Sequence, residues 1–148
     1  MNSFAPDQIR KASSEDASVC AQIKNDWIDE TDWMPRVHPA DDVERHYSEY
    51  VFERREVFVF GDPPKGYLAL DTEDGFVTSL FVSARDQGIG KALLDRAKQV
   101  LNELQLWTFQ ANTGAIRFYH REGFVEIDRT DGDNEEFLPD VLMKWVAA

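Results

Sequence analysis

The sequence predicts a single α/β domain of the α+β type, with a central mixed and mostly antiparallel sheet of about seven strands and four helices. Runs of β-branched and aromatic residues, separated by short turns, follow one another between residues 56 and 82. Between residues 76 and 110, a strand-like run, a glycine turn, an amphipathic helix and another strand-like run succeed one another. That order is typical of two parallel strands joined by a crossover. A length of 148 residues fits one domain, 1–148, and is short for two.

A short strand and a helix are predicted at the start of the chain. Residues 8–12 favour a strand, and Ser13 with Asp16 matches a helix start. Cys20 is the only cysteine, so an internal disulfide is excluded, and we expect it to be a small buried residue on the helix. The apolar positions of that helix are Val19, Cys20, Ile23 and Trp27.

Residues 27–38 have no clean periodicity and are predicted to form a loop. They contain two tryptophans, three carboxylates and a histidine. Such a loop can line a pocket for an amine, because aromatic rings offer flat contact and carboxylates can pair with or deprotonate a cation. It can equally be a packed connector with solvated acids, since loops carry function but also need anchoring. By this location, Glu30, Asp32 and His38 are weak candidates for a general base.

A second helix and three strands follow. Pro39 at a first helical position, with Val43, Tyr47, Tyr50 and Val51 behind it, predicts the helix, on which His46 is expected at the surface. Residues 56–61, 66–71 and 76–82 then favour strands with short turns between them. Consecutive strands with short connections form an antiparallel meander.

The central segment, residues 76–102, is a strand, a glycine turn and an amphipathic helix. A helix that opens at Gly88 and Gly90 offers unpaired N–H groups and the positive end of its dipole to an anion, above all a phosphate. Arg85 and Lys91 add cationic side chains at the rim. The segment lacks the residues of a Walker A loop and of a dinucleotide fingerprint, so neither ATP nor NAD is indicated.

The C-terminal third is predicted to alternate strands with one short helix. Residues 104–110 read as a buried strand parallel to the strand at 76–82. A helix from about Thr113 to Glu122 ends at Gly123. Two last strands lie at 124–130 and 141–146, with an acidic loop from Asp131 to Asp140 between them.

Two motifs in this order resemble the GCN5-related N-acetyltransferase (GNAT) family. Arg85-Asp86-Gln87-Gly88-Ile89-Gly90 matches its Arg/Gln-x-x-Gly-x-Gly signature, and residues 112–124 match Asn-x-x-Ala-x-x-Phe-Tyr-x-x-x-Gly-Phe at every fixed position. The resemblance covers about residues 8–146. It implies a sheet that splays apart between its fourth and fifth strands, and acetyl-CoA as acyl donor with its pantetheine arm in the gap.

The resemblance also implies which residues bind acetyl-CoA. Backbone groups of the fourth strand would bond the pantetheine as an added strand would, the glycine turn would hold the pyrophosphate, and Asn112 would bond the arm across the gap. The turn lacks a proline and is about two residues shorter than is usual in the family, which can move the pantetheine contacts toward Ser79 and Leu80. The implied set is Leu80, Phe81, Val82, Arg85, Gln87, Gly88, Ile89, Gly90, Lys91, Asn112 and Tyr119.

The implied reaction is acetyl transfer from the thioester to an amine. Tyr119 is the predicted general acid, because a phenol with an ordinary pKa of about 10 holds a proton at neutral pH that a departing thiolate can take. No residue stands out as the base. Asp71 and Glu73 join the loop candidates because they lie near a strand end. Three histidines and one cysteine show no metal-ligand spacing, so we expect no metal.

Charge and composition limit the partners. A net charge of -12 repels nucleic acid and anionic membranes, and either steers cationic amines or simply maintains solubility. The absence of a signal sequence or an apolar span predicts a soluble, cytoplasmic protein.

The sequence does not identify the amine that accepts the acetyl group, which can belong to a small molecule or a peptide. A homodimer is common in the family, but no segment indicates an interface. A non-catalytic acetyl-CoA sensor and a protein-interaction module remain alternatives.

Overall fold

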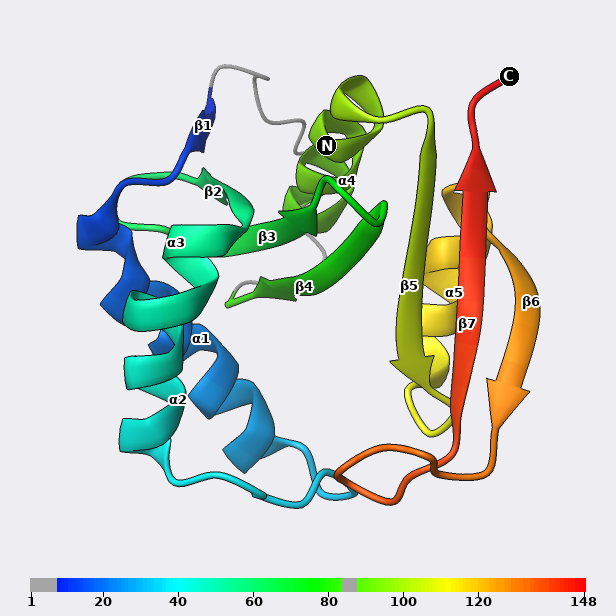
Figure 1. The fold of residues 1–148 in the computed structure, drawn as a ribbon, viewed down its shortest axis with the longest axis horizontal. Coiled ribbons are helices and arrows are strands. Elements are labelled where there is room, and N and C mark those ends of the chain that lie inside the picture. The colour runs from blue at the N-terminus through cyan, green and yellow to red at the C-terminus, as the bar shows by residue number, and fades with distance from the viewer. Residues whose placement is uncertain (1–7, 84–87) are drawn as a thin grey trace.

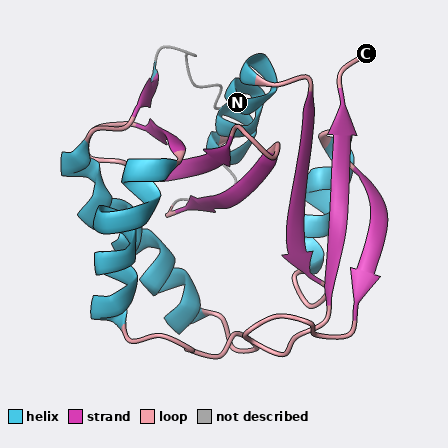
Figure 2. Cartoon of the chain, in the orientation of Figure 1, coloured by secondary structure: helices cyan, strands magenta, loops and turns pink. Residues whose placement is uncertain are grey.

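The computed structural model describes residues 8–83 and 88–148. Figure 1 shows their arrangement, and Figure 2 distinguishes helices, strands and loops. The elements are β1 (Ile9–Lys11), the 3₁₀ turn η2 (Ser14–Asp16), α1 (Ala17–Glu30), α2 (Ala40–His46), the π-helical η3 (Tyr47–Val51), α3 (Phe52–Arg54), β2 (Glu56–Phe60), β3 (Gly66–Asp71), β4 (Phe76–Val82), α4 (Ile89–Val100), β5 (Glu103–Phe109), α5 (Thr113–Arg121), β6 (Val125–Thr130) and β7 (Asp140–Val146).

These strands form one mixed sheet in the order β1-β2-β3-β4-β5-β7-β6. The neighbours β4 and β5 run parallel, and the other neighbouring pairs are antiparallel. This confirms the predicted fold class, the meander of β2 to β4 and the parallel crossover through α4. The position of β7 between β5 and β6 was not predicted.

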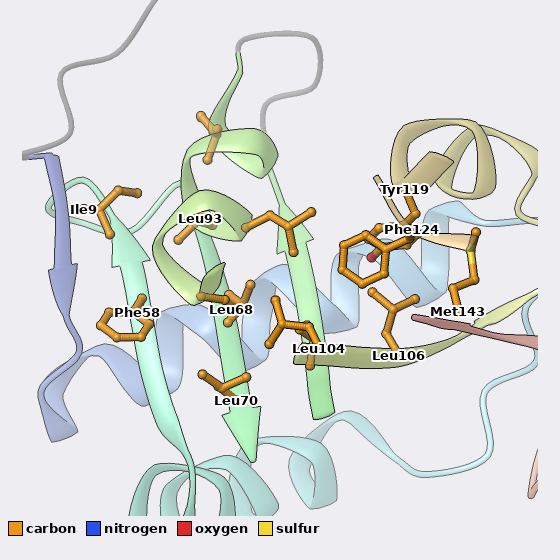
Figure 3. Packing of buried hydrophobic residues seen from close by; sticks show 14 of the residues in the cluster. Ile9, Phe58, Leu68, Leu70, Leu93, Leu104, Leu106, Tyr119, Phe124 and Met143 are labelled. Atoms are coloured by element: carbon orange, nitrogen blue, oxygen red, sulfur yellow. The ribbon is translucent and has the colours of Figure 1, made fainter. Parts of the chain in front are cut away.

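Two apolar clusters hold helices against the sheet. The larger cluster lies under α4 and α5 and includes Leu68, Leu93, Leu104 and Phe124, all at most 1% exposed (Figure 3). The other cluster joins α1 and η3 to the opposite face of β2 and β3. Cys20 belongs to it with no exposed surface, so its expected role as a small buried residue is confirmed.

The structure corrects several predicted boundaries. Helix α1 continues to Glu30, so Trp27 lies on the helix as predicted from its apolar spacing, whereas Glu30 lies on the helix and not in the predicted loop. Pro39 is the N-cap of α2 and not its first helical residue. Helix α4 ends at Val100, two residues before the predicted end of the segment at 102, and β5 begins at Glu103, one residue before the predicted strand. The differences at Pro39 and at the end of α4 are of one or two residues, the usual uncertainty of an element boundary.

An ion pair fixes the junction of β1 and α1. The Asp16 carboxylate accepts hydrogen bonds from Nη1 and Nη2 of Arg10 at 2.8 and 2.9 Å and from the Ser13 N–H at 2.9 Å. Asp16 is 5% exposed. The Arg10 hydrogen bond lowers the pKa of Asp16, because it favours the charged form.

Replacing Asp16 by asparagine is expected to lower the free energy of unfolding by about 1–3 kcal/mol at neutral pH, because charge-assisted hydrogen bonds are lost from a mostly buried site. The folded-state pKa of Asp16 lies below the unfolded value of about 4. The stabilisation is therefore complete above that value and is lost as the pH falls through the folded-state pKa. Urea unfolding of both proteins at neutral and acidic pH measures it. A cost independent of pH would contradict the ion-pair explanation.

Candidate functional site

Strands β4 and β5 are neighbours that separate almost at once. Their ladder contains one pair among the described residues, Phe76 with Gln105, near the beginning of both strands. Beyond it, β4 is paired only with β3, and β5 only with β7. Figure 1 shows the two strands diverging from this point. The β5-facing edge of β4 is therefore an open strand edge inside the sheet, as the resemblance implied.

The register of β4 identifies the peptide groups that face this gap. The Ser83 N–H donates to the Lys65 carbonyl oxygen at 2.8 Å, so Ser83 faces β3. Because successive residues of a strand direct their peptide groups to opposite sides, Phe81 also faces β3, whereas Leu80 and Val82 face the gap. Of the three predicted pantetheine contacts, this geometry favours Leu80 and Val82.

Helix α4 begins at the predicted glycine turn. Gly88 is its N-cap with φ of 77°, a left-handed conformation that glycine adopts without a Cβ clash. The first intrahelical bond runs from the Ala92 N–H to the Gly88 oxygen at 3.0 Å, which leaves the N–H groups of Ile89, Gly90 and Lys91 without helical acceptors. Three donors at the positive end of a helix dipole suit an anion. Arg85 and Gln87 lie outside the described residues.

Lys91 is less available than the sequence suggested. Its Nζ lies 3.1 Å from the Glu122 carboxylate and 3.3 Å from Asp95, and the hydrogen bond with Glu122, followed by that with Asp95, raises its pKa. The pair with Glu122 ties the beginning of α4 to the end of α5. Because two carboxylates partly neutralise the ammonium group, the N–H groups of α4 are the stronger anion donors here.

The second motif positions Asn112 and Tyr119. The Asn112 Oδ1 accepts from the Ala115 N–H at 3.1 Å and caps α5, which leaves the amide NH₂ for other contacts. Tyr119 is 8% exposed, and its ring lies 5.6 Å from that of Phe124 (Figure 3). Burial raises the pKa of Tyr119, so its phenol is protonated at neutral pH.

Four aromatic side chains cross from β4 to β5. The Trp27 ring lies 5.1 Å from Phe81 of β4, the Trp33 ring lies 5.8 Å from Phe109 of β5, and the two tryptophans are 5.7 Å apart. We call Trp27, Trp33, Phe81 and Phe109 the aromatic row. Through Trp27 and Trp33, residues 27–38 contact both strands that border the gap.

The candidate bases are dispersed. Glu30 and Asp32 are exposed at the end of α1 and just after it. His38 Nε2 lies 3.0 Å from Glu135, which joins the two acidic loops predicted from the sequence. Asp71 accepts from the N–H groups of its own turn and lies 3.8 Å from Arg55, while Glu73 is exposed in that turn.

Sequence reasoning missed Lys24 and Glu136. Burial lowers the pKa of Lys24, and the carboxylates of Glu136 and Glu135 oppose that shift. Burial likewise raises the pKa of Glu136. Lys24 could have been noticed, because it lies four residues after Cys20 and three before Trp27, on the apolar face of α1. Glu136 carries no such signal.

The described residues contain no cluster of three His, Cys, Asp or Glu side chains arranged to hold a metal ion. None of the helices described in the structure is long and apolar enough to cross a bilayer.

Comparisons with known proteins agree with this geometry. The family profile described as "Acetyltransferase (GNAT) domain" matches residues 47–126. The peptidyl-lysine N-acetyltransferase YiaC of Escherichia coli (strain K12) is 36% identical over 82 residues, which are 54% of this chain and 55% of that protein. The chain thus matches about half the length of this relative.

Two solved structures share the fold. YjaB from Escherichia coli, in its apo form, superposes with a TM-score of 0.76 at 22% identity, covering 95% of this chain and 97% of YjaB. The structure of yncA from Salmonella typhimurium, solved with its cofactor acetyl-CoA, has a TM-score of 0.69 at 21% identity and covers 95% and 93% of the two chains.

Proposed function

The chain belongs to the GNAT acetyltransferase family, and from this premise we propose that it transfers an acetyl group from acetyl-CoA directly to a primary amine of a small molecule or peptide. One observation carries the proposal: the open edge of β4 lies beside α4, whose first N–H groups have no helical acceptor. A diphosphate fits the helix end, and an amide-bearing arm fits the strand edge.

In this proposal, backbone groups of α4 and β4 bind different parts of acetyl-CoA. The N–H groups of Ile89, Gly90 and Lys91 hold the pyrophosphate, and the peptide groups of Leu80 and Val82 hold the pantetheine arm. Acetyl-CoA supplies the thioester whose acyl group is transferred. The aromatic row lines the acceptor side of the gap and excludes water from it.

Retention of acetyl-CoA tests this function against the alternatives. We expect acetyl-CoA to raise the melting temperature and amines to release free thiol in its presence. Small amines and lysine peptides belong in the same screen, because the relative from E. coli is named a peptidyl-lysine N-acetyltransferase. Stabilisation without thiol release would favour a sensor, and no stabilisation would favour an interaction module.

For the general base we favour Glu136 over Glu30, Asp32 and His38. Burial raises the pKa of Glu136 and so makes its carboxylate a stronger base, whereas Glu30 and Asp32 are exposed and His38 is paired with Glu135. The loop that carries Glu136 contacts the segment after α1 through His38 and Glu135, and Trp33 of that segment belongs to the aromatic row.

Glu136→Gln is expected to lower kcat/KM by about 10²-fold at neutral pH, because the amide cannot take a proton from the amine. In the wild type, kcat/KM should rise with pH as Glu136 loses its proton, and the variant should lack that limb of the profile. Glu30→Gln, an equal charge change at an exposed site, is the control. An unchanged acid limb in Glu136→Gln would exclude Glu136 as the base.

A further inference from the structure

A small pocket of about 140 Å³ lies between α1, the α2–η3 helix and β4. Its lining carries three groups that are or can become cations, and no carboxylate. This is unexpected in a chain with 28 acidic and 16 basic residues, where a random patch would be acidic. Its polar lining includes Lys24, His46, Tyr47, Arg55, Thr78 and Ser79.

No carboxylate of the described residues lies within 4 Å of the partly buried Lys24 ammonium group, although the more distant Glu136 and Glu135 carboxylates favour its charged form. Its Nζ lies 5.8 Å from the centre of the Tyr47 ring. Removing a charged group from water without pairing it costs free energy. An anion bound in the pocket would offset part of this desolvation free energy by pairing with the Lys24 ammonium group. The pocket therefore favours a negatively charged ligand group.

Arg55 and His46 also line the pocket and can donate hydrogen bonds. The Arg55 guanidinium lies 5.4 Å from the Tyr50 ring centre and has one long contact to Asp71, at 3.8 Å, so most of its five donors remain available. His46 stacks on Tyr50 with ring centres 5.1 Å apart. A planar carboxylate matches the planar guanidinium fork.

The pocket adjoins the point where β4 changes register. The ladder with β3 shifts between Ala69 and Leu70, which places Thr78 and Ser79 at a bulge. Beneath them, the hydroxyls of Tyr47 and Tyr67 are hydrogen-bonded to each other. The pocket therefore lies on the α1 face of β4, the face on which Phe81 meets Trp27, and across β4 from α4.

We propose that this pocket binds a carboxylate of the acceptor, so that the amine bearing it extends across β4 toward the thioester. The proposal rests on the acetyltransferase function and narrows its substrate class to amines that carry a carboxylate. A volume of about 140 Å³ is below the 300–1,000 Å³ typical of a whole ligand site, so the pocket is a subsite for one end of the acceptor. The carboxylate can come from a free amino acid or from an acidic residue of a peptide.

Kinetics with paired acceptors test the proposal. We expect ω-amino acids of suitable chain length to have kcat/KM values roughly tenfold or more above those of their carboxamides, because only the acid can pair with Lys24 and Arg55. In Lys24→Met this ratio should fall toward one, and Lys24→Arg should restore part of it. Lysine peptides with a neighbouring glutamate or glutamine distinguish a peptide source from a free amino acid.

The matched control is Lys11→Met, which removes the same charge from an exposed lysine on β1, 71% exposed. It should leave the acid-to-amide ratio at the wild-type value. Lys24→Met should fold, because methionine keeps the aliphatic stem and removes a poorly solvated charge. Equal rates for acids and amides at every chain length in the wild type would overturn the role of the pocket in acceptor binding.

A binding measurement separates this proposal from the acetyltransferase function. Glutarate, which has no amine, should raise the melting temperature of the wild type and of Lys11→Met but not that of Lys24→Met. Equal shifts in melting temperature in all three proteins would contradict carboxylate binding in this pocket, whether or not the protein acetylates any amine. A Lys24-dependent shift without thiol release from any amine would support the anion pocket and contradict the acetyltransferase function.

Discussion

Replacing Gly88 by valine is expected to remove most of the stabilisation that acetyl-CoA confers. At a ligand concentration of 100 times Kd, that stabilisation is about 2.7 kcal/mol in the wild type. Gly88 has φ of 77°, and a β-branched residue would drive the backbone out of this region. The N–H groups of Ile89, Gly90 and Lys91 would then point away from the phosphate position.

Two variants separate backbone geometry from simple blockage. Gly88→Asn adds a side chain but tolerates the left-handed conformation, so it should keep more of the acetyl-CoA stabilisation than Gly88→Val. Gly90→Ala should retain both fold and binding, because its Cβ would lie 3.6 Å from the Phe118 ring, an ordinary contact. Thermal unfolding with and without acetyl-CoA measures all three. A folded Gly88→Val variant with the full wild-type shift would remove the glycine turn from the binding site.

Local signals were sufficient for most of the fold. The glycine turn and the helix after it follow from residues that restrict φ and from an apolar stripe, and Gly123 ends α5 with φ of 94° for the same reason. The strand boundaries of β2, β3 and β4 agree with the predicted runs to within one residue. These features depend on residues a few positions apart.

Contacts between distant segments were not accessible in this way. His38 contacts Glu135, 97 positions away in the sequence, and Trp33 contacts Phe109 across the gap. No pattern of neighbouring residues in the sequence indicates either contact. The cationic pocket combines Lys24 of α1 with Arg55 and with β4. A net charge of -12 gave no reason to expect it, because overall charge does not report how charges are distributed over the surface.

Tyr119 is predicted to assist departure of the thiolate mainly by a hydrogen bond. A thiol has an ordinary pKa of about 8.5, whereas burial holds the pKa of this phenol above its ordinary value of about 10. Complete proton transfer to a free thiolate would thus be uphill by more than about 2 kcal/mol, at about 1.4 kcal/mol per pKa unit. A hydrogen bond to sulfur that strengthens as charge develops avoids that cost. The benefit should therefore lie at the lower end of general acid catalysis.

Tyr119→Phe is accordingly expected to lower kcat by about 10²-fold while leaving acetyl-CoA affinity within a small factor of the wild-type value. No described residue hydrogen-bonds the Tyr119 hydroxyl, and its ring packs with Phe118 and Phe124, so phenylalanine should preserve the fold. Single-turnover rates and thermal shifts measure chemistry and binding separately. An unchanged single-turnover rate would exclude Tyr119 from the chemical step, and loss of the acetyl-CoA shift would assign its hydroxyl to holding the pantetheine arm.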